Sequence, residues 1–488
     1  MVSSLRCQVF ALLSLLTLLG GAGSAGGVAP QYNSNLCDFP ACACPRSYSK
    51  IVCTCDQKIQ EITLQATGFD YLPNTLGSIE INRCATVVVT RRSIKNITPL
   101  RRIALTNIGQ LQLDEEAFYW DTTQNLDSYI HPGIDIVIAN SSIPTLPSEV
   151  FKGHINSITL QRVHISLIKA LAFANIARME KIEISNSNID TIVPQAFKKF
   201  ILNTFIVEGG RIGSMPTYSM NAVQVMNDIK FENVNFGIIQ SSALKITEPK
   251  VFRLRSCTIS QLEGEAFHIT TKGPIFIDDN IFHYTARGAF LRINLDPRSI
   301  YTSGIQELVF ENNTLDKFEE YALFFNTSGI KPRIDQIIIN RPCACTELNA
   351  WSTKLVKFST DQTPKNFDKL MRCLKGKQDV TLLEYQLKNC TSNTSRVYLI
   401  VTILIVILIS LLCICSVGFW LFRKHAKRYM NVPTNDGNNR LSVLSSTSNH
   451  IIVLPERKIY RETELNVMTE CVEPIKEYVP PQAITQPL

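Results

Sequence analysis

Cysteine is the residue type that offers this chain the most chemistry, because thiols can pair as disulfides, bind metal or act as nucleophiles. The chain has 15 cysteines among 488 residues, and most fall in two clusters. These clusters are Cys37, Cys42, Cys44, Cys53 and Cys55, and then Cys343, Cys345, Cys373 and Cys390. In a secreted chain such density predicts a disulfide framework. A zinc site is the alternative, but the spacing matches no zinc knuckle.

Catalytic motifs are missing from the sequence. The chain has seven histidines and contains no H-E-x-x-H, no G-x-S-x-G and no phosphate loop. His164 falls in a predicted turn and His283 follows the apolar residue Phe282, so we expect both at the surface. The sequence therefore predicts a protein that is not an enzyme, with no catalytic residue, metal or cofactor.

Two apolar runs set the expected compartment. Arg6 precedes an apolar run over residues 9–19 and small residues ending at Ala25, which predicts a signal peptide over residues 1–25. A buried N-terminal helix is the alternative, but the run is short and ends in glycine. The uncharged run over residues 397–422 is long enough to cross a hydrocarbon core of about 30 Å. Basic residues follow it, which predicts a single-pass type I protein of the plasma membrane with an extracellular N-terminus.

Net charge gives no argument for a nucleic-acid partner. The value of +7 is a small excess of 49 basic over 42 acidic residues. Binding to nucleic acid depends on a dense basic surface. We therefore expect no nucleic acid among the partners.

A repeated frame organises the region between the cysteine clusters. In residues 179–197 an apolar pair, Ile182 and Ile184, is followed thirteen positions later by Phe197. Nine units share this frame, with Phe, Met or Leu at plus thirteen: Leu105/Phe118, Ile138/Phe151, Leu160/Phe173, Ile184/Phe197, Val207/Met220, Phe231/Leu244, Leu254/Phe267, Ile277/Phe290 and Phe310/Leu323. The alternating apolar pair predicts a short strand. Units this small must stack on their neighbours to bury their apolar faces.

Twelve such strands are expected. They lie at residues 62–64, 79–81, 103–105, 136–138, 158–160, 182–184, 205–207, 229–231, 252–254, 275–277, 308–310 and 337–339. Turns and short helical pieces, such as residues 115–118, are expected on the opposite side. Two of the intervals between successive predicted strands are longer than the others, which predicts insertions near residues 119–132 and 291–304. Insertions in a repeat protein map to loops on one face.

The frame has a length of 22 to 24 residues and resembles the leucine-rich-repeat pattern LxxLxLxxNxLxxLxxxaF over about residues 62–340. The two cysteine clusters resemble the N- and C-terminal caps of extracellular single-pass transmembrane members of that family. The resemblance implies an α/β, β-rich solenoid with a parallel concave sheet, capped at both ends. It also implies the pairs Cys37–Cys44, Cys42–Cys53, Cys343–Cys373 and Cys345–Cys390, with Trp351 packed over the final repeat.

The family carries a buried Asn ladder three positions after the strand anchor. Only Asn280 and Asn313 keep that residue, while the other units have Cys84, Ile108, Ser141, Val163, Ser187, Gly210, Val234 and Cys257. We therefore expect some irregular repeats. Cys257 is expected to be a buried structural thiol, and Cys55 could pair with Cys84.

The expected concave face exposes the residue between each apolar pair and the residue just after it. A mixed apolar and basic patch results, formed by Ile206, Lys230, Arg253, Arg255, Phe276 and Val309. Aromatic and Arg side chains are enriched among interface anchors, so this patch is the candidate partner-binding site. The outer row also holds Glu208, Glu232, Asp278 and Glu311. The alternative is that charges on adjacent strands only satisfy one another.

Modification motifs agree with this topology. Sequons for N-glycosylation occur at Asn96, Asn140, Asn312, Asn326, Asn389 and Asn393, all before the predicted span. Residues 423–488 are polar and turn-rich, which predicts a disordered cytoplasmic tail. Its Tyr429, Tyr460 and Tyr478 are candidate phosphorylation sites that would recruit an adaptor.

The expected organisation is a signal peptide (1–25), an N-terminal cap (26–60), the repeats (61–341), a C-terminal cap (342–395), a transmembrane helix (397–422) and the tail (423–488). We expect a cell-surface receptor or adhesion molecule that recognises an extracellular or cell-surface protein ligand through the repeat face. The alternative is a membrane-anchored structural component of an extracellular or apical matrix. Fold alone does not fix function.

Overall fold

The computed structural model describes residues 34–45, 49–56, 58–120, 133–360 and 367–429. The predicted signal peptide and the tail residues Tyr460 and Tyr478 lie outside these ranges, as do the side chains of Asn393 and Tyr429.

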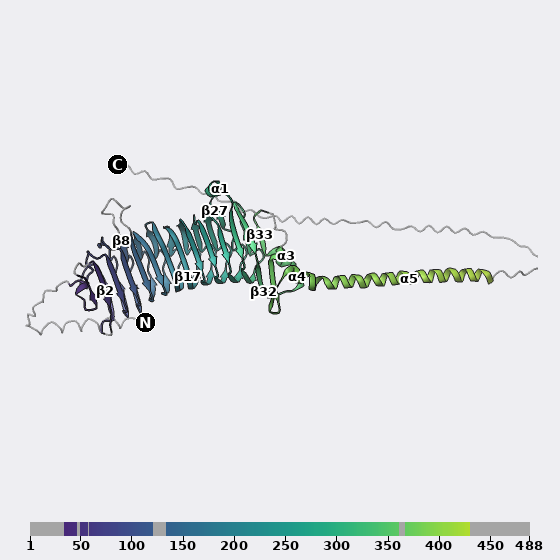
Figure 1. The fold of residues 1–488 in the computed structure, drawn as a ribbon, viewed down its shortest axis with the longest axis horizontal. Coiled ribbons are helices and arrows are strands. Elements are labelled where there is room, and N and C mark those ends of the chain that lie inside the picture. Colours follow the sequence, from purple (N-terminus) through teal and green to yellow (C-terminus); the bar gives the residue numbers. More distant parts are fainter. Residues whose placement is uncertain (1–33, 46–48, 57, 121–132, 361–366, 430–488) are drawn as a thin grey trace, which may run out of the picture. The chain divides into compact units, whose positions relative to one another are not determined.

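The repeats form a β-solenoid of about eleven turns of parallel strands (Figure 1). Each turn contributes strands to up to three faces, which we name A, B and C. Face A holds β2 (Lys50–Thr54), β4 (Ser78–Asn82), β6 (Arg102–Thr106), β9 (Ile134–Ala139), β12 (Ile155–Gln161), the first parts of β15 (Met179–Ile192) and β17 (Ile201–Met215), β19 (Asp228–Glu232), β22 (Val251–Arg255), β25 (Ile275–Asp278), β28 (Gln306–Glu311) and β31 (Ile330–Asp335).

Faces B and C follow in each turn. Face B holds β3 (Glu61–Leu64), β5 (Thr86–Val89), β7 (Gln110–Leu113), β10 (Ser142–Leu146), β13 (His164–Ile168), the later parts of β15 and β17, β20 (Asn235–Ile239), β23 (Thr258–Leu262), β26 (Ile281–Thr285), β29 (Thr314–Phe318) and β32 (Ile337–Pro342). Face C holds β8 (Phe118–Trp120), β11 (Phe151–Gly153), β14 (Phe173–Ile176), β16 (Phe197–Lys198), β18 (Met220–Val225), β21 (Leu244–Thr247), β24 (Phe267–Thr271) and β27 (Ile293–Leu295), with β30 (Leu323–Phe325) and β33 (Val356–Phe358) as a separate pair.

Ten of the twelve predicted strands, from residues 79–81 to 308–310, lie side by side on face A in the predicted register. The predictions for the first and the last strand are wrong, because these strands do not lie on face A. Residues 62–64 lie in β3 and residues 337–339 in β32, and both belong to face B. Face A instead begins at β2 and ends at β31. The sequence hides these strands because Cys53 and Pro332 occupy anchor positions that are usually aliphatic.

The predicted helical piece at residues 115–118 is also wrong. Residues 115–117 form a turn, and Phe118 begins strand β8. The extended backbone suits this position because Phe118 pairs in register with Phe151 of the next turn, with ring centroids 5.5 Å apart. Face C is therefore built from short strands where the resemblance implied turns and helical pieces.

A left-handed residue turns the chain from face A to face B in most turns. Arg83, Asn107, Asn140, Arg162, Asn186, Asn233, Ser256, Asp279 and Asn312 occupy this corner with φ between 49° and 60°. Asn and Asp tolerate this region better than most residues, which explains their frequency there. In β17 the corner is Gly209-Gly210, and a Cβ on Gly210 would lie 2.0 Å from the Ser187 carbonyl oxygen.

A continuous apolar core runs inside the solenoid. The plus-thirteen residues are 0 to 2 % exposed, which confirms that they are core anchors. Their rings stack from turn to turn: Phe151 and Phe173 have centroids 5.0 Å apart, and Phe173 and Phe197 have centroids 4.4 Å apart. Such stacking adds to the apolar burial that holds each turn on the next.

Disulfides fasten both ends of the solenoid, and the described residues contain five of them. Cys37–Cys44 and Cys42–Cys53 join η1 (Leu36–Asp38), β1 (Cys42–Ala43) and β2, while Cys55–Cys84 ties together the first two turns. At the other end Cys343–Cys373 and Cys345–Cys390 hold α2 (Cys345–Lys354), β34 (Met371–Lys375) and η2 (Gln386–Cys390). Four of these are the pairs that the resemblance implies.

Smaller elements complete this end of the chain. They are α3 (Phe367–Leu370), β35 (Gln378–Thr381) and α4 (Leu382–Tyr385). Trp351, on α2, is only 4 % exposed and belongs to the solenoid's apolar core, as expected. The guanidinium of Arg341 lies 5.5 Å from the centre of its indole ring.

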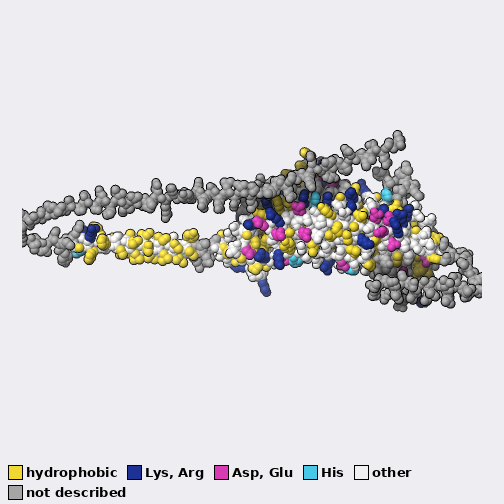
Figure 2. All heavy atoms as spheres, turned by 180° about the vertical axis from the view of Figure 1, so that it is seen from behind, with side chains coloured by type: hydrophobic (Ala, Val, Ile, Leu, Met, Phe, Trp, Pro, Cys, Tyr) yellow, Lys and Arg dark blue, Asp and Glu magenta, His cyan; other side chains and the backbone are white. Residues whose placement is uncertain are grey.

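Helix α5 (Thr391–Tyr429) follows the last disulfide. Its segment Val397–Ala426 contains an 18-residue stretch with a mean hydropathy of 3.2 and is long and apolar enough to cross a membrane. Figure 2 shows hydrophobic side chains covering this helix, whereas charged side chains of both signs are scattered over the solenoid.

Candidate functional site

Parallel strands in register place the outward residues of face A in columns. The middle column runs Glu183, Ile206, Lys230, Arg253, Phe276, Val309 and Arg333, with one residue per turn. The next column runs Ser185, Glu208, Glu232, Arg255, Asp278, Glu311 and Asp335. The structure therefore brings all six predicted partner-binding residues onto one face, over neighbouring strands.

Val309 is not available to a partner. It is 4 % exposed, although it occupies the same column as the partly exposed Ile206 and Phe276. Its strand neighbours are Phe276 on one side and Arg333 on the other. The prediction that Val309 is an exposed contact is wrong, since position in the frame does not reveal how larger neighbours cover a small side chain.

Phe276 is the aromatic centre of this face. The Arg253 guanidinium lies 5.1 Å from the centre of its ring. This cation–π contact fixes the ring and leaves it partly exposed between two charged strands. An aromatic side chain held in this way resembles the anchors that dominate protein interfaces.

Every cation of the patch is paired with a carboxylate of the same sheet. Lys230 pairs with Asp228 at 3.2 Å and Arg253 approaches Glu232 at 3.9 Å. Arg255 pairs with Asp278 at 3.2 Å, while Arg333 approaches Glu311 at 3.7 Å. The alternative interpretation, in which neighbouring charges satisfy one another, therefore describes these cations correctly.

The face that surrounds the patch is acidic overall. On the strands from β17 to β31 and at the adjoining corner, its outward described residues include five cations, Lys230, Arg253, Arg255, Lys331 and Arg333. They also include eight carboxylates, Glu208, Asp228, Glu232, Asp278, Asp279, Glu307, Glu311 and Asp335, an excess of three negative charges. Burial raises the pKa of the Asp278 carboxyl above its ordinary range, and the nearby Arg255 partly offsets this effect.

Two sequons flank this face at the same corner of the solenoid. Asn140 and Asn312 are both exposed, left-handed corner residues. The side-chain amide of Asn140 donates to Asn107 at 3.0 Å, and that of Asn312 donates to Asp279 at 2.7 Å. Asn96 and Asn389 are exposed as well. Asn326 is partly buried, and its amide donates to Asn294 at 2.6 Å.

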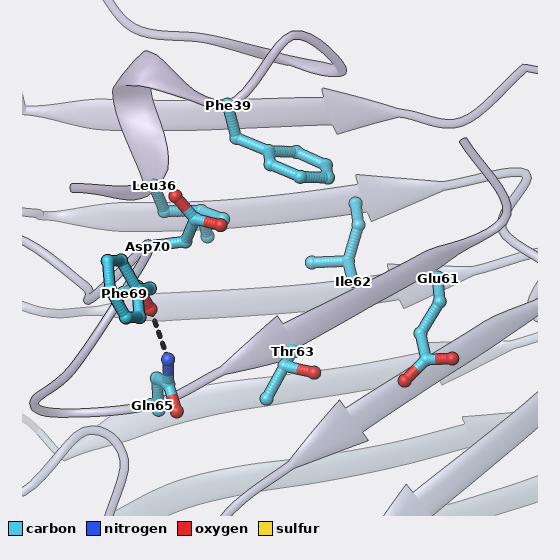
Figure 3. A pocket seen from close by; sticks show the side chains of 8 residues that line it. All are labelled: Leu36, Phe39, Glu61, Ile62, Thr63, Gln65, Phe69 and Asp70. Carbon is cyan, nitrogen blue, oxygen red and sulfur yellow. Dashed lines mark hydrogen bonds between the residues drawn. The ribbon is translucent and has the colours of Figure 1, made fainter. Parts of the chain in front are cut away.

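A cavity of about 370 Å³ lies at the N-terminal end (Figure 3). Leu36, Phe39, Ile62 and Phe69 supply its apolar lining. Two of the four polar residues beside them are already engaged, because Gln65 donates to the Phe69 carbonyl and Asp70 accepts from Ser34 at 2.8 Å, which leaves Glu61 and Thr63. The cavity therefore presents few groups that could orient a ligand.

Other chemically notable groups are structural. The carboxylate of Glu116 contacts Arg92, Lys152 and Arg91, which hold its pKa down at about 2. Burial raises the pKa of the free thiol of Cys257 to about 12, and this thiol faces the backbone carbonyls of Phe231 and Arg255. Such a thiol is a poor nucleophile. Over the described ranges, no cluster of three His, Cys, Asp or Glu side chains could hold a metal ion.

Comparison with known proteins adds no assignment. A scan against protein-family models and a search of curated proteins found no match for this chain.

Proposed function

We propose that this protein is a cell-surface receptor or adhesion molecule of the leucine-rich-repeat type, which binds another protein through face A. The observation that carries this proposal is the partly exposed Phe276 ring, held by Arg253 among paired charges on a regular sheet. Protein interfaces combine a few aromatic and Arg anchors with a surrounding polar rim. Face A offers both over the strands from β17 to β31.

Membrane attachment supports the same function. Helix α5 is long enough to span a bilayer, and Arg423, Lys424, Lys427 and Arg428 follow its apolar segment. Positive charges favour the cytoplasmic side, so the solenoid is assigned to the outside of the cell in the plasma membrane. Five disulfides agree with an oxidising compartment. The repeat length and the end disulfides support the family assignment and the role of both ends as caps.

Reversing two charges beside Phe276 should abolish partner binding. The double substitution Arg253→Glu and Arg255→Glu removes the cation over the ring and leaves Asp278 and Glu232 unpaired, so we expect binding to weaken by about 2 kcal/mol or more. The measurement compares full-length wild type and variant, displayed on cells, in a screen against cell-surface and secreted proteins.

A matched control is Arg287→Glu with Arg298→Glu, which changes the charge equally at exposed sites away from face A. This control should bind as wild type does. If the Arg253/Arg255 variant reached the surface normally and bound every ligand as tightly as wild type, face A would not be the binding site.

Glycan occupancy should follow the accessibility of each sequon. We expect glycans at the exposed Asn96, Asn140 and Asn312. We expect none at Asn326, which is partly buried, or at Asn389, whose sequon contains the disulfide-bonded Cys390. Site-by-site mass spectrometry of the protein purified from animal cells measures this. Occupancy confined to Asn326 and Asn389 would contradict the placement of these residues, and complete absence of glycans would contradict the extracellular assignment.

A second candidate is a membrane-anchored structural component of an extracellular or apical matrix that associates laterally. The excess of carboxylates on face A and the lysines Lys198, Lys199 and Lys245 on or beside face C favour this candidate, because opposite charges on two faces suit contacts between neighbouring molecules.

A further inference from the structure

Face C carries a column of basic residues. On successive strands this column holds Ala174, which is buried, and then the outward residues Lys198, Asn221, Lys245 and His268. Lys199 and Arg292 lie beside this column, and both are exposed. Lys198, Lys199 and Lys245 make no ion pair with any described residue, while Arg292 pairs with Glu265 at 2.9 Å. This strip therefore has four cations and one carboxylate within the described residues.

The positive excess extends beyond the column itself. The corners that border these strands add Lys250, Lys272, Arg287 and Arg298 and the carboxylates Glu248, Glu263 and Asp296. Burial lowers the pKa of His268, and the positive charges of Arg292 and Lys245 lower it further. The lowered pKa of His268 thus agrees with a positive potential, created by its neighbours, on this face.

Faces A and C have opposite net charge. On face C, Lys198, Lys245 and Arg292 recur at every second turn, as the strand registers from β16 to β27 require. On face A, Glu232, Asp278 and Asp335 recur at every second turn, on β19, β25 and β31, and the strands β17, β22 and β28 hold Glu208, Arg255 and Glu311 in the same column. Neighbouring strands lie about 4.8 Å apart on both faces, so the cations of face C are about 9.6 Å apart. Two such columns can remain in step over several turns.

We propose that face A of one molecule docks on face C of a second copy of this chain. A second copy fits better than an unrelated basic protein because its cations have the period of the carboxylates that they meet. The two surfaces are different patches, so the contact is heterologous and continues from molecule to molecule in a row. The inference shares face A with the proposed function but does not require another partner protein.

Charge reversal on each face tests this contact. Full-length protein in detergent micelles, labelled separately with a donor and an acceptor fluorophore, would be mixed and followed by energy transfer. Lys198→Glu with Lys245→Glu should weaken self-association about tenfold, and Glu232→Lys with Asp335→Lys should do the same. A variant with all four substitutions restores opposite charges between the faces and should regain most of the affinity. Raising the salt from about 50 mM to about 500 mM should weaken the wild-type association, since the contact is electrostatic.

The control is Lys58→Glu with Lys377→Glu, which reverses two exposed lysines outside both faces. This control should associate as wild type does. The proposal is overturned if the two face variants behave like the control, or if both lose association and the fourfold variant fails to recover. The Lys198/Lys245 variant leaves face A intact, so its binding to an unrelated partner protein reports on the proposed function separately.

Discussion

Replacing Phe290 by alanine should lower the free energy of unfolding by about 3–5 kcal/mol. Phe290 is fully buried, and its ring centroid lies 5.7 Å from Phe267, 5.9 Å from Phe282, and 5.6 Å from both Phe310 and Phe325. It therefore joins three consecutive turns of the core. Stability in a solenoid is the sum of contacts between neighbouring repeats, so a cavity at this position weakens two interfaces at once.

The control for this substitution is Phe324→Ala. Phe324 lies on β30 between the buried Leu323 and Phe325 but points outward, where Lys357 covers its ring at 5.2 Å. Removal of the Phe324 ring should lower the free energy of unfolding by about 1 kcal/mol or less. Equilibrium denaturation of the full-length protein in detergent, followed by circular dichroism, measures both variants. Equal losses for Phe290→Ala and Phe324→Ala would show that the plus-thirteen ring is not a core anchor.

Replacing Asn280 by leucine should also lower the free energy of unfolding by about 3–5 kcal/mol, but for a different reason. The side-chain amide of Asn280 donates to the backbone carbonyl of Leu254 at 2.9 Å and to the side-chain oxygen of Asn313 at 2.9 Å. Its own side-chain oxygen accepts from the Cys257 backbone amide at 2.9 Å. Leucine matches the volume of this side chain approximately but leaves the groups on residues 254 and 257 buried without partners.

Asn235→Leu provides the matched control, because Asn235 points outward from β20 and is exposed. We expect the free energy of unfolding of this variant to lie within about 0.5 kcal/mol of the wild-type value. Denaturation curves measured under the conditions used for Phe290 compare the two. If Asn280→Leu were as stable as Asn235→Leu, the buried asparagines would not satisfy the turns in the way described.

The ladder also shows what the sequence could not reveal. Asn was missing from most plus-three positions, so irregular turns were expected. In the structure, Ser141 and Ser187 take the same role. The Ser141 hydroxyl accepts a hydrogen bond from the backbone amide of Ile108, and the Ser187 hydroxyl accepts one from that of Val163, in each case the equivalent residue one turn earlier. A serine in a turn has many alternative partners. Only the register of the neighbouring strand identifies which one it binds.

Face A was predictable because its strands carry a strict apolar alternation. Faces B and C were not. Face B has outward residues such as Ser142, Asn235 and Gly237, whose types are depleted in strands or favour turns. The strands of face C have only two to six residues, which is too short for a clear alternation. In β17 the strand passes through Gly209 and Gly210, a pair that normally indicates an end to a strand. Tight stacking explains this exception, because a Cβ on either glycine would collide with the preceding turn.

The residues of the candidate site were predictable, but their electrostatics were not. The frame placed Lys230, Arg253 and Phe276 on one face, and the structure has them in one column. Their ion pairs, however, depend on side chains from the next strand and from residues outside the frame, such as Asp228. The sequence therefore identified a patch of side chains but not the ion pairs and the excess of carboxylates that surround it.

Side-chain footprinting of the full-length protein with a bound partner protein tests most directly whether face A is the recognition surface. Phe276 and Ile206 are partly exposed on face A, whereas Ile238 and Ile281, 37 % and 40 % exposed, lie on face B. With partner present, oxidation of Phe276 and Ile206 by hydroxyl radicals should fall several-fold, while that of Ile238 and Ile281 stays constant. Protection of Ile238 and Ile281 with Phe276 still fully reactive would contradict the account.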